Sequence, residues 1–459
     1  MAEQRHAVRP ETQAGGAVYG DAVATVEPFS IEHIPSTERH GRTGNLFWLW
    51  FAANLTIADY ALGFLPVTLG VPLGTTILML AIGNVLGAAL VGACAAMGIR
   101  GGFPQMFMGR RSFGRTGGYL PAGLNWLSTA GWFTVNTILG AFALQILWSS
   151  LPFWTAAGIL VVAQTAIVIY GHNLIHAFER AMAAVLGVLF AIATIVALTH
   201  WSRIGAYHGA AAGRTLSSAA IVLAASFSYV MSWSPYASDY SRYLPEGASL
   251  RRAFLSTFAG AGLASFWLEI LGALVAILAV GGAANSIGAL DQVMGGFGTW
   301  AVIAVVLGAC AANALNLYSN TMSARVMDLK LPRWQLAVAG GALGFVLALI
   351  GHVNFLDNYT NFLLLLDYWI TPWLAVVLVD FYLLRHQRPD EFRLARPIGA
   401  TGLVCYLLGI AASIPFMSGS YFTGFLAPHL GGADFSYFIG FAVAGAAYLL
   451  AERGDTVRV

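Results

Sequence analysis

Tryptophan and asparagine side chains stand together inside apolar stretches of this 459-residue sequence. Trp132 and Asn136 are four residues apart, so on a helix both lie on the same face. An aromatic plane beside an amide suits a planar heterocycle, because the ring stacks while the amide donates and accepts hydrogen bonds. Trp233, Asn313 and Asn316 lie in other apolar stretches. Buried amides cost free energy unless they are paired, so these residues together predict a binding site, although a tryptophan taken alone is more often a packing residue than a ligand.

Three carboxylates also occur within apolar stretches, at Asp59, Glu269 and Asp367. An ionisable group at membrane depth is costly and usually functional. Each of the three is therefore a candidate to bind and release a proton. The alternative for each one is a neutral or hydrogen-bonded structural group.

Two further acids, Asp239 and Asp328, lie nearer the ends of apolar stretches. Arginines close to them in the sequence, Arg242 and Arg325, are their expected ion-pair partners. We predict a structural or gating role for these two acids.

Polar residues interrupt two of the apolar stretches at mid-depth. The first interruption runs over 54–59 and the second, which contains Pro235, over 226–239. Proline removes a backbone donor, and irregular backbone survives inside a membrane only where it lines a protein cavity. Both segments are predicted to be broken helices, and the alternative is a pair of kinks without function.

Composition indicates that the solvent around this chain is lipid. Hydrophobic residues make up 58% and charged residues 10%, against roughly 25% charged residues in a soluble protein. Lys+Arg (23) and Asp+Glu (21) nearly balance, so no nucleic-acid partner is expected. Apolar runs of about 20 residues predict an all-α polytopic membrane protein with about twelve transmembrane helices. The predicted spans are 45–68, 72–97, 117–148, 153–171, 181–201, 218–239, 254–281, 299–325, 334–353, 355–383, 398–418 and 434–452.

The distribution of positive charge predicts the orientation. With the N-terminus inside, all of the Lys and Arg residues except Arg203 and Arg214 fall in inner segments or in the two tails. The prediction is a multi-pass protein of the plasma (inner) membrane with both termini cytoplasmic.

The interrupted spans are the first and the sixth, which are five spans apart. Because five is an odd number, a repeated five-helix unit would sit inverted in the bilayer, as in many secondary transporters. The predicted organisation is a cytoplasmic tail (1–44), a first repeat (45–201), a second repeat (218–383), two peripheral helices (384–452) and a second cytoplasmic tail (453–459).

Short motifs along most of the chain carry a family resemblance. They lie at 31–41, 47–54, 101–106, 111–114, 131–136 (Gly-Trp-Phe-Thr-Val-Asn), 226–227, 236–240 (Tyr-Ala-Ser-Asp-Tyr) and 316–319 (Asn-Leu-Tyr-Ser), with Asn125 between the fourth and fifth. In their order and placement they resemble the nucleobase–cation symporter-1 family, and specifically its purine–cytosine permease branch.

This resemblance implies a LeuT-like fold, with ten core helices in two inverted repeats and two peripheral helices. It also implies uptake of nucleobases such as cytosine, adenine, guanine or hypoxanthine. The residues that match the family's substrate positions are Ala53, Asn54, Trp132, Asn136, Trp233 and Asn316, with Phe227 as an alternative to Trp233.

The coupling ion is predicted from the eighth span. Sodium-coupled relatives place hydroxyl side chains there, facing carbonyls of the first span. The corresponding residues here look like Ala311 and Ala312, which offer no side-chain oxygen. Hard cations need several oxygen ligands, so a proton is favoured and Na⁺ is the alternative.

Other classes of protein are less compatible with the sequence. A membrane enzyme would need a catalytic motif, and none is recognised; His172 and His176 have the spacing of a metal pair but are expected in a solvated loop or at a helix end. A channel would need pore-lining rings. Within the transporter class, the alternatives are carriers of allantoin, hydantoins, uracil, thiamine or pyridoxine-like rings. No cofactor or metal is expected, and a monomer is predicted.

Overall fold

Helices account for nearly all of the regular structure in the computed structural model, which describes residues 19–20, 26–279, 285–393, 395–419 and 422–456. By length and composition, eight helices in this part of the chain are apolar enough to cross a membrane, and shorter apolar helices cover 57–68, 153–169 and 400–416. The final helix, α20, has 21 residues and carries Arg453 in its last turn. Each of the twelve predicted spans therefore coincides with helix, and the predicted C-terminal tail lies partly outside the described residues.

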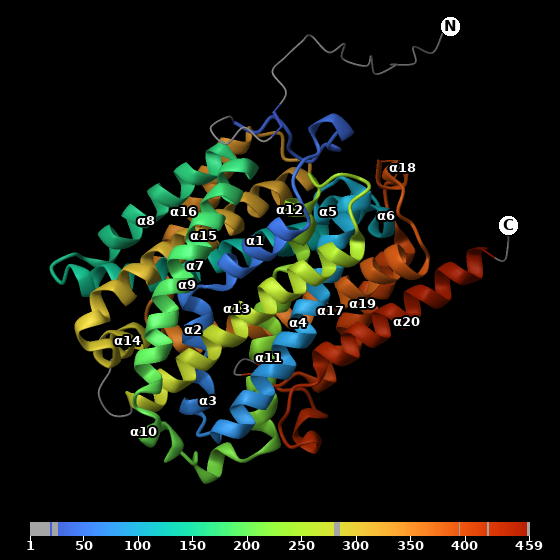
Figure 1. Ribbon diagram of the computed structural model, residues 1–459. Helices are drawn as coiled ribbons and strands as arrows, with labels where there is room; N and C mark the ends of the chain where they lie inside the picture. The colour runs from blue at the N-terminus through green and yellow to red at the C-terminus, as the bar shows by residue number, and fades with distance from the viewer. Residues whose placement is uncertain (1–18, 21–25, 280–284, 394, 420–421, 457–459) are drawn as a thin grey trace, which may run out of the picture.

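In chain order, the helices form ten spans, which divide into two sets of five, and a final pair. Figure 1 shows how they are arranged. The first five spans are α1–α3 (Gly44–Asn54, Ile57–Leu62, Phe64–Thr68), α4 (Leu73–Gly101), α7 (Tyr119–Leu147), α8 (Phe153–Tyr170) and α9 (His172–Leu198). The next five are α11 (Leu216–Met231) with η3 (Ser234–Tyr236) and α12 (Ala237–Ser241), α13 (Leu250–Leu278), α15 (Gly298–Val326), α16 (Arg333–Gly351) and α17 (Phe355–Leu378) with the π-helical turn η5 (Val379–Leu383). The last two are α19 (Ala400–Ser413) and α20 (Ser436–Thr456).

Short helices connect these spans: α5 (Gln105–Met108), α6 (Arg110–Phe113), α10 (Trp201–Gly205), α14 (Ser286–Met294) and α18 (Pro389–Arg393). One predicted boundary was wrong. The fifth span was expected to begin at 181, but α9 begins at His172 because Gly171, with φ of 90°, makes the turn after α8 by itself.

Both predicted helix breaks are present. Helix α1 ends at Asn54, and Thr56 is extended (φ −116°, ψ 156°) and caps α2 by accepting the Asp59 N–H at 3.3 Å. Helix α11 ends at Met231, and the chain passes through a 3₁₀ turn that contains Pro235 before α12. The breaks are shorter than the predicted interruptions. Thr56 and Pro235 lie at the breaks, whereas Asp59, Ser226 and Asp239 lie inside the flanking helices.

Glycines allow the broken helices to pack closely against their neighbours. A Cβ atom on Gly87 of α4 would lie 2.9 Å from the Phe227 carbonyl oxygen of α11. A Cβ atom on Gly63 would lie only 2.1 Å from the Glu269 carbonyl oxygen of α13. Helices α1–α2, α4, α11 and α13 thus form one packed group, while α7 packs with α8, α15 and α16 in a second group.

Helices α19 and α20 pack on each other and on α17. They lie at one side of the molecule (Figure 1), which agrees with two peripheral helices outside a core of ten. The described part of the segment before α1 is not freely solvated, since Ile34 and Arg39 are buried against the bundle.

Candidate functional site

Trp132 of α7 lies inside a cage of aromatic side chains near the two breaks. Its ring meets Tyr229, Tyr359 and Phe362 edge-on, with centroids 5.2, 6.0 and 5.2 Å away. The indole is 4% exposed, and its N–H has no hydrogen-bond partner. One turn further along α7, Asn136 donates to the Trp132 carbonyl at 3.1 Å, but its own side-chain oxygen accepts nothing. A buried donor and a buried acceptor are therefore unpaired on one helix face.

Trp233 joins the two broken helices. Its indole N–H donates to the Asn54 side-chain oxygen at 3.0 Å, and Asn54 in turn donates to the Trp50 carbonyl at 2.8 Å. The Trp233 ring packs edge-on against Trp50, with centroids 5.5 Å apart. Ala53, next to Asn54, is fully buried. These residues hold the end of α1 to the break after α11.

Asn316 and Asn313, the two α15 amides predicted from the sequence, have different surroundings. Asn316 accepts a hydrogen bond from the Tyr236 hydroxyl at 3.0 Å, next to the second break. The Asn313 amide donates instead to the Phe133 carbonyl at 2.9 Å and to Gln164 at 3.0 Å. Asn313 thus ties α15 to α7 and α8, and its donor atoms are already used.

Phe227 lies apart from this group. Its ring stacks on Tyr437 of α20, with centroids 5.2 Å apart. The tyrosine two residues later, Tyr229, is the one that meets Trp132. Tyr229 and Tyr359 were not singled out from the sequence, because nothing in their spacing distinguishes them from packing aromatics.

Asp59 and Glu269 come together between α2 and α13. The Asp59 Oδ2 atom accepts from the Ser265 hydroxyl at 2.5 Å, and Glu269 Oε2 accepts from Asn84 at 2.5 Å and Ser226 at 2.8 Å. Both side chains are fully buried, and the second oxygen of each carboxylate has no partner. Among the described residues, neither forms an ion pair with a Lys, Arg or His side chain.

The third predicted carboxylate, Asp367 of α17, is also buried, and neither of its oxygens is hydrogen-bonded. The acid that it faces is Asp434, just before α20. Glu179 of α9 is a second buried carboxylate whose two oxygens both lack a partner, and it lies in the stretch that was predicted to connect the fourth and fifth spans. It was missed because α9 begins earlier than predicted.

A cavity of about 620 Å³ opens on the side of the molecule away from the segment before α1. It is lined by residues of α2, α3, α7 and α14 and by Phe355 of α17. The Phe355 ring stacks on Tyr359, with centroids 5.6 Å apart, and Tyr359 packs against Trp132. This pair of stacked rings separates the cavity from Trp132.

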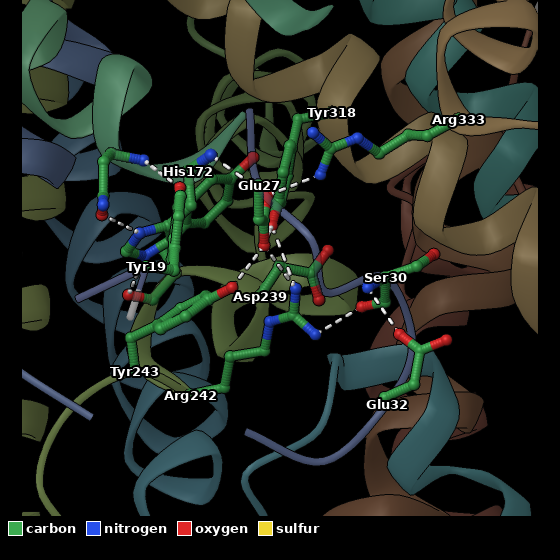
Figure 2. A network of polar contacts seen from close by, with 12 residues as sticks. Tyr19, Glu27, Ser30, Glu32, His172, Asp239, Arg242, Tyr243, Tyr318 and Arg333 are labelled. Atoms are coloured by element: carbon green, nitrogen blue, oxygen red, sulfur yellow. Dashed lines mark hydrogen bonds and ion pairs between the residues drawn. The ribbon is translucent and has the colours of Figure 1, made fainter. Parts of the chain in front are cut away.

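The opposite side is closed by a cluster around Glu27 (Figure 2). One carboxylate oxygen accepts from Arg242 at 3.0 Å, Tyr243 at 2.6 Å and Tyr318 at 2.9 Å. The other accepts from Arg333 at 2.6 Å. The Glu27 and Arg242 side chains are fully buried. Glu27 precedes α1, whereas its partners follow α12, lie on α15 and begin α16, so a single carboxylate links both packed groups of helices.

The expected position of the histidine pair was partly wrong. His172 is at a helix end, as predicted, but it is 4% exposed rather than solvated. Its backbone N–H donates to Glu27 at 3.1 Å, and its ring approaches His176, with centroids 4.3 Å apart. The Glu27 cluster buries it.

The predicted partner of Asp239 was wrong. Asp239 accepts from the Gln105 backbone N–H and from the Ser319 hydroxyl, both at 2.8 Å. Arg242 is held by Glu27 instead. The tail that supplies Glu27 could not be placed from periodicity, because it contains no repeating apolar pattern.

The predicted pairing of Asp328 with Arg325 was also wrong. Asp328 forms ion pairs with Arg110 at 3.2 Å and Arg115 at 2.9 Å, and it accepts from the Tyr119 hydroxyl. Burial alone would raise the pKa of Asp328, but these donors and charges outweigh it and hold the pKa below the usual value. The acid joins the α6–α7 region to the end of α15.

Two helices broken at matching positions, with unpaired polar atoms and uncompensated acids beside the breaks, define a secondary transporter of the inverted-repeat class. A family model described as a permease for cytosine/purines, uracil, thiamine and allantoin matches residues 33–440. The chain belongs to this family.

Its relatives and a solved structure agree with this assignment. The chain is 32% identical to a putative purine-cytosine permease of Bacillus subtilis, over 92% of this chain and 95% of that protein. It is 26% identical to a purine-cytosine permease of Emericella nidulans, over 93% and 88%. A nucleobase-cation-symport-1 family transporter, solved in a closed conformation with bromovinylhydantoin bound, superimposes with a TM-score of 0.77 at 20% identity, over 93% and 95%. The LeuT-like fold expected from the sequence is confirmed.

Proposed function

We propose that the protein imports a nucleobase, cytosine or a purine, together with a cation by alternating access. The observation that carries the proposal is the unpaired indole N–H of Trp132 beside the unpaired amide oxygen of Asn136, inside a buried aromatic cage. A planar ring with N–H and carbonyl groups on its edge complements both atoms. The purine-cytosine permeases among its relatives support this substrate class.

In the proposed complex, the base lies against Trp132 and presents a ring or exocyclic N–H to Asn136. Stacking contributes about 0.5–1.5 kcal/mol beyond the area that is buried, and a hydrogen bond contributes about as much. Trp233, Asn54 and Asn316 border the same region at the breaks, and Ala53 leaves room next to Asn54. We assign Asn313 a supporting role and leave Phe227 outside the site, because their contacts are to other helices.

A proton is the proposed coupling ion. Helix α15 faces the break of α1 at Gly308, where a Cβ atom would lie 2.9 Å from the Leu55 carbonyl. One turn away, Ala311 and Ala312 are buried and add no side-chain oxygen for Na⁺. The buried acids without counter-charges at Asp59 and Glu269 favour a proton instead.

The proposed cycle opens one side of the site at a time. The Glu27 cluster closes the side of the segment before α1, and the Phe355–Tyr359 pair closes the other. The clustering of positive residues supports an orientation with both termini cytoplasmic in the plasma (inner) membrane. We propose a monomer that works with the repeats 45–201 and 218–383 and the peripheral helices 384–452.

Direct binding tests this proposal. Purified protein is titrated with cytosine, adenine, guanine and hypoxanthine while tryptophan fluorescence is recorded. Trp132→Ala is expected to abolish binding of whichever base quenches the wild type, whereas Trp148→Ala, which changes a tryptophan that is 63% exposed, leaves it intact.

Normal binding by the Trp132→Ala protein would overturn the assignment of Trp132 to the substrate site. If the protein instead prefers allantoin, a hydantoin, uracil, thiamine or pyridoxine to all four bases, its substrate belongs to the alternative class of planar rings.

A further inference from the structure

We propose that Asp59 and Glu269 hold a single proton between them and that this carboxylate pair is the coupling site. The inference rests on the proposed proton-coupled uptake, and it names both the proton-binding atoms and the stoichiometry.

Two independent contacts bring the carboxylates together. Ser265 and Glu269 are four residues apart on α13, and Ser265 donates to Asp59. Gly63 follows Asp59 by four residues at the end of α2, and it lies directly against the Glu269 backbone. The two acids therefore face each other across the α2–α13 contact, close enough for their charges to interact.

The surroundings stabilise one negative charge but not two. Three neutral donors serve the pair: Ser265 bonds to Asp59, while Asn84 and Ser226 both bond to one oxygen of Glu269. Two tyrosines, Tyr229 of α11 and Tyr359 of α17, also lie close enough to interact with both acids. No described Lys, Arg or His pairs with either acid.

Two buried carboxylates at such a contact share a proton, because two adjacent uncompensated charges in a medium of low dielectric repel each other strongly. Proton binding forms one O–H bond on a carboxylate oxygen and reduces two negative charges to one. The two unpartnered oxygens, Asp59 Oδ1 and Glu269 Oε1, are the available acceptors. With two donors on Glu269 and one on Asp59, the charge is better stabilised on Glu269 and the proton resides on Asp59.

The pair is connected to both broken helices. The Asp59 N–H bonds to Thr56, whose hydroxyl lies 2.7 Å from the Tyr229 hydroxyl, and Tyr229 packs on Trp132. Ser226, which bonds Glu269, is one turn before Tyr229 on α11. Each broken helix therefore contacts both the acid pair and the aromatic cage. Binding of a proton to the pair thus alters the contacts of the two broken segments that also border the proposed substrate site.

Substrate uptake into proteoliposomes, measured in buffers without sodium, tests the proposal. A gradient of about one pH unit stores about 1.4 kcal/mol per proton, enough for about tenfold accumulation with one proton per substrate and about a hundredfold with two. The wild type is expected to reach the tenfold value. Asp59→Asn and Glu269→Gln are expected to equilibrate substrate without accumulation, yet still exchange internal for external substrate. Asp390→Asn, which removes an exposed carboxylate, accumulates like the wild type.

Accumulation by both variants at the wild-type level would overturn the proposal, as would a hundredfold wild-type value. If a sodium gradient drives uptake by the wild type but not by Glu269→Gln, the pair is a sodium site, and this result would also overturn the proposal.

Infrared spectroscopy separates this proposal from the proposed function, because it needs no substrate. Because other buried acids also contribute, the readout is an infrared difference spectrum at neutral pH: wild type minus Asp59→Asn should contain the C=O stretch of a protonated carboxylic acid, and wild type minus Asp390→Asn should not. A band unchanged in Asp59→Asn refutes the shared proton even if no nucleobase binds. A band that is lost as expected supports the pair even if the substrate proves to be a different ring.

Discussion

Replacing Glu27 by glutamine should open the side of the transporter that the Glu27 cluster closes. The substitution removes the charge that compensates Arg242, whose side chain is fully buried, and weakens the contact to Arg333. Breaking a buried ion pair by removing one partner costs about 3–5 kcal/mol. Because glutamine keeps one acceptor oxygen for Tyr243 or Tyr318, we take the lower end, about 3 kcal/mol. That shifts the closed–open equilibrium by roughly a hundredfold.

Cysteine labelling measures this shift. Ser319 is fully buried on α15, next to Tyr318 of the cluster, so a reagent from this side reaches it only when the side opens. In a protein without native cysteines, Ser319→Cys reacts with a maleimide at a rate set by the open population. Glu27→Gln is expected to raise that rate by up to about a hundredfold.

The matched control is Glu32→Gln in the same segment. Glu32 is exposed and accepts only the Ser30 backbone N–H, at 2.6 Å. An unchanged labelling rate in Glu27→Gln, or an equal rise in Glu32→Gln, would refute the view that the cluster holds this side shut.

Three further substitutions test separate contacts. Trp233→Phe removes the indole bond to Asn54 and should weaken substrate binding by about 1 kcal/mol, or about fivefold, in a fluorescence titration; unchanged affinity would argue against a role for that bond. Gly63→Ala places a Cβ atom 2.1 Å from a backbone oxygen of α13 and should lower the melting temperature, whereas Gly74→Ala, which meets nothing within 4 Å, should not. Burial, assisted by a nearby arginine, lowers the pKa of His33 to about 4 from 6.5. Because the pKa of His33 is lower in the folded protein, packing of the segment before α1 is fully stable above pH 6.5 and weakens as the pH falls toward 4. Protease cleavage of this segment should therefore increase on acidification in the wild type and stay constant in His33→Gln.

The spans and breaks were predictable because membranes impose simple rules. Each crossing needs a long apolar run, and a residue such as Pro235 in the middle of one requires a reason. The start of α9 was missed because Gly171 replaces a whole loop, and hydropathy does not register a one-residue turn. As a result, Glu179 was assigned to the connection between two spans, whereas it is buried on α9.

The candidate site was only partly predictable, since side-chain spacing identifies a face but not its partners. Trp132 and Asn136 could be placed on one helix face from their spacing, and the structure leaves one polar atom of each side chain unpaired. The spacing could not show that the Asn313 amide donates its hydrogen bonds to neighbouring helices. The meeting of Asp59 with Glu269 depends on how α2 packs against α13, which no local pattern encodes.

The Glu27 cluster also constrains how the protein is made. Glu27 leaves the ribosome before any of its partners, and Arg333 follows it by 306 residues. At about 5–20 residues per second, roughly 15 to 60 s pass between them. The helices must therefore insert without this contact, and the segment before α1 can dock only after the ninth span has begun to emerge. Full docking of that segment thus requires the chain to have been made as far as α16, and a chain arrested before Arg333 would leave the segment open to proteases.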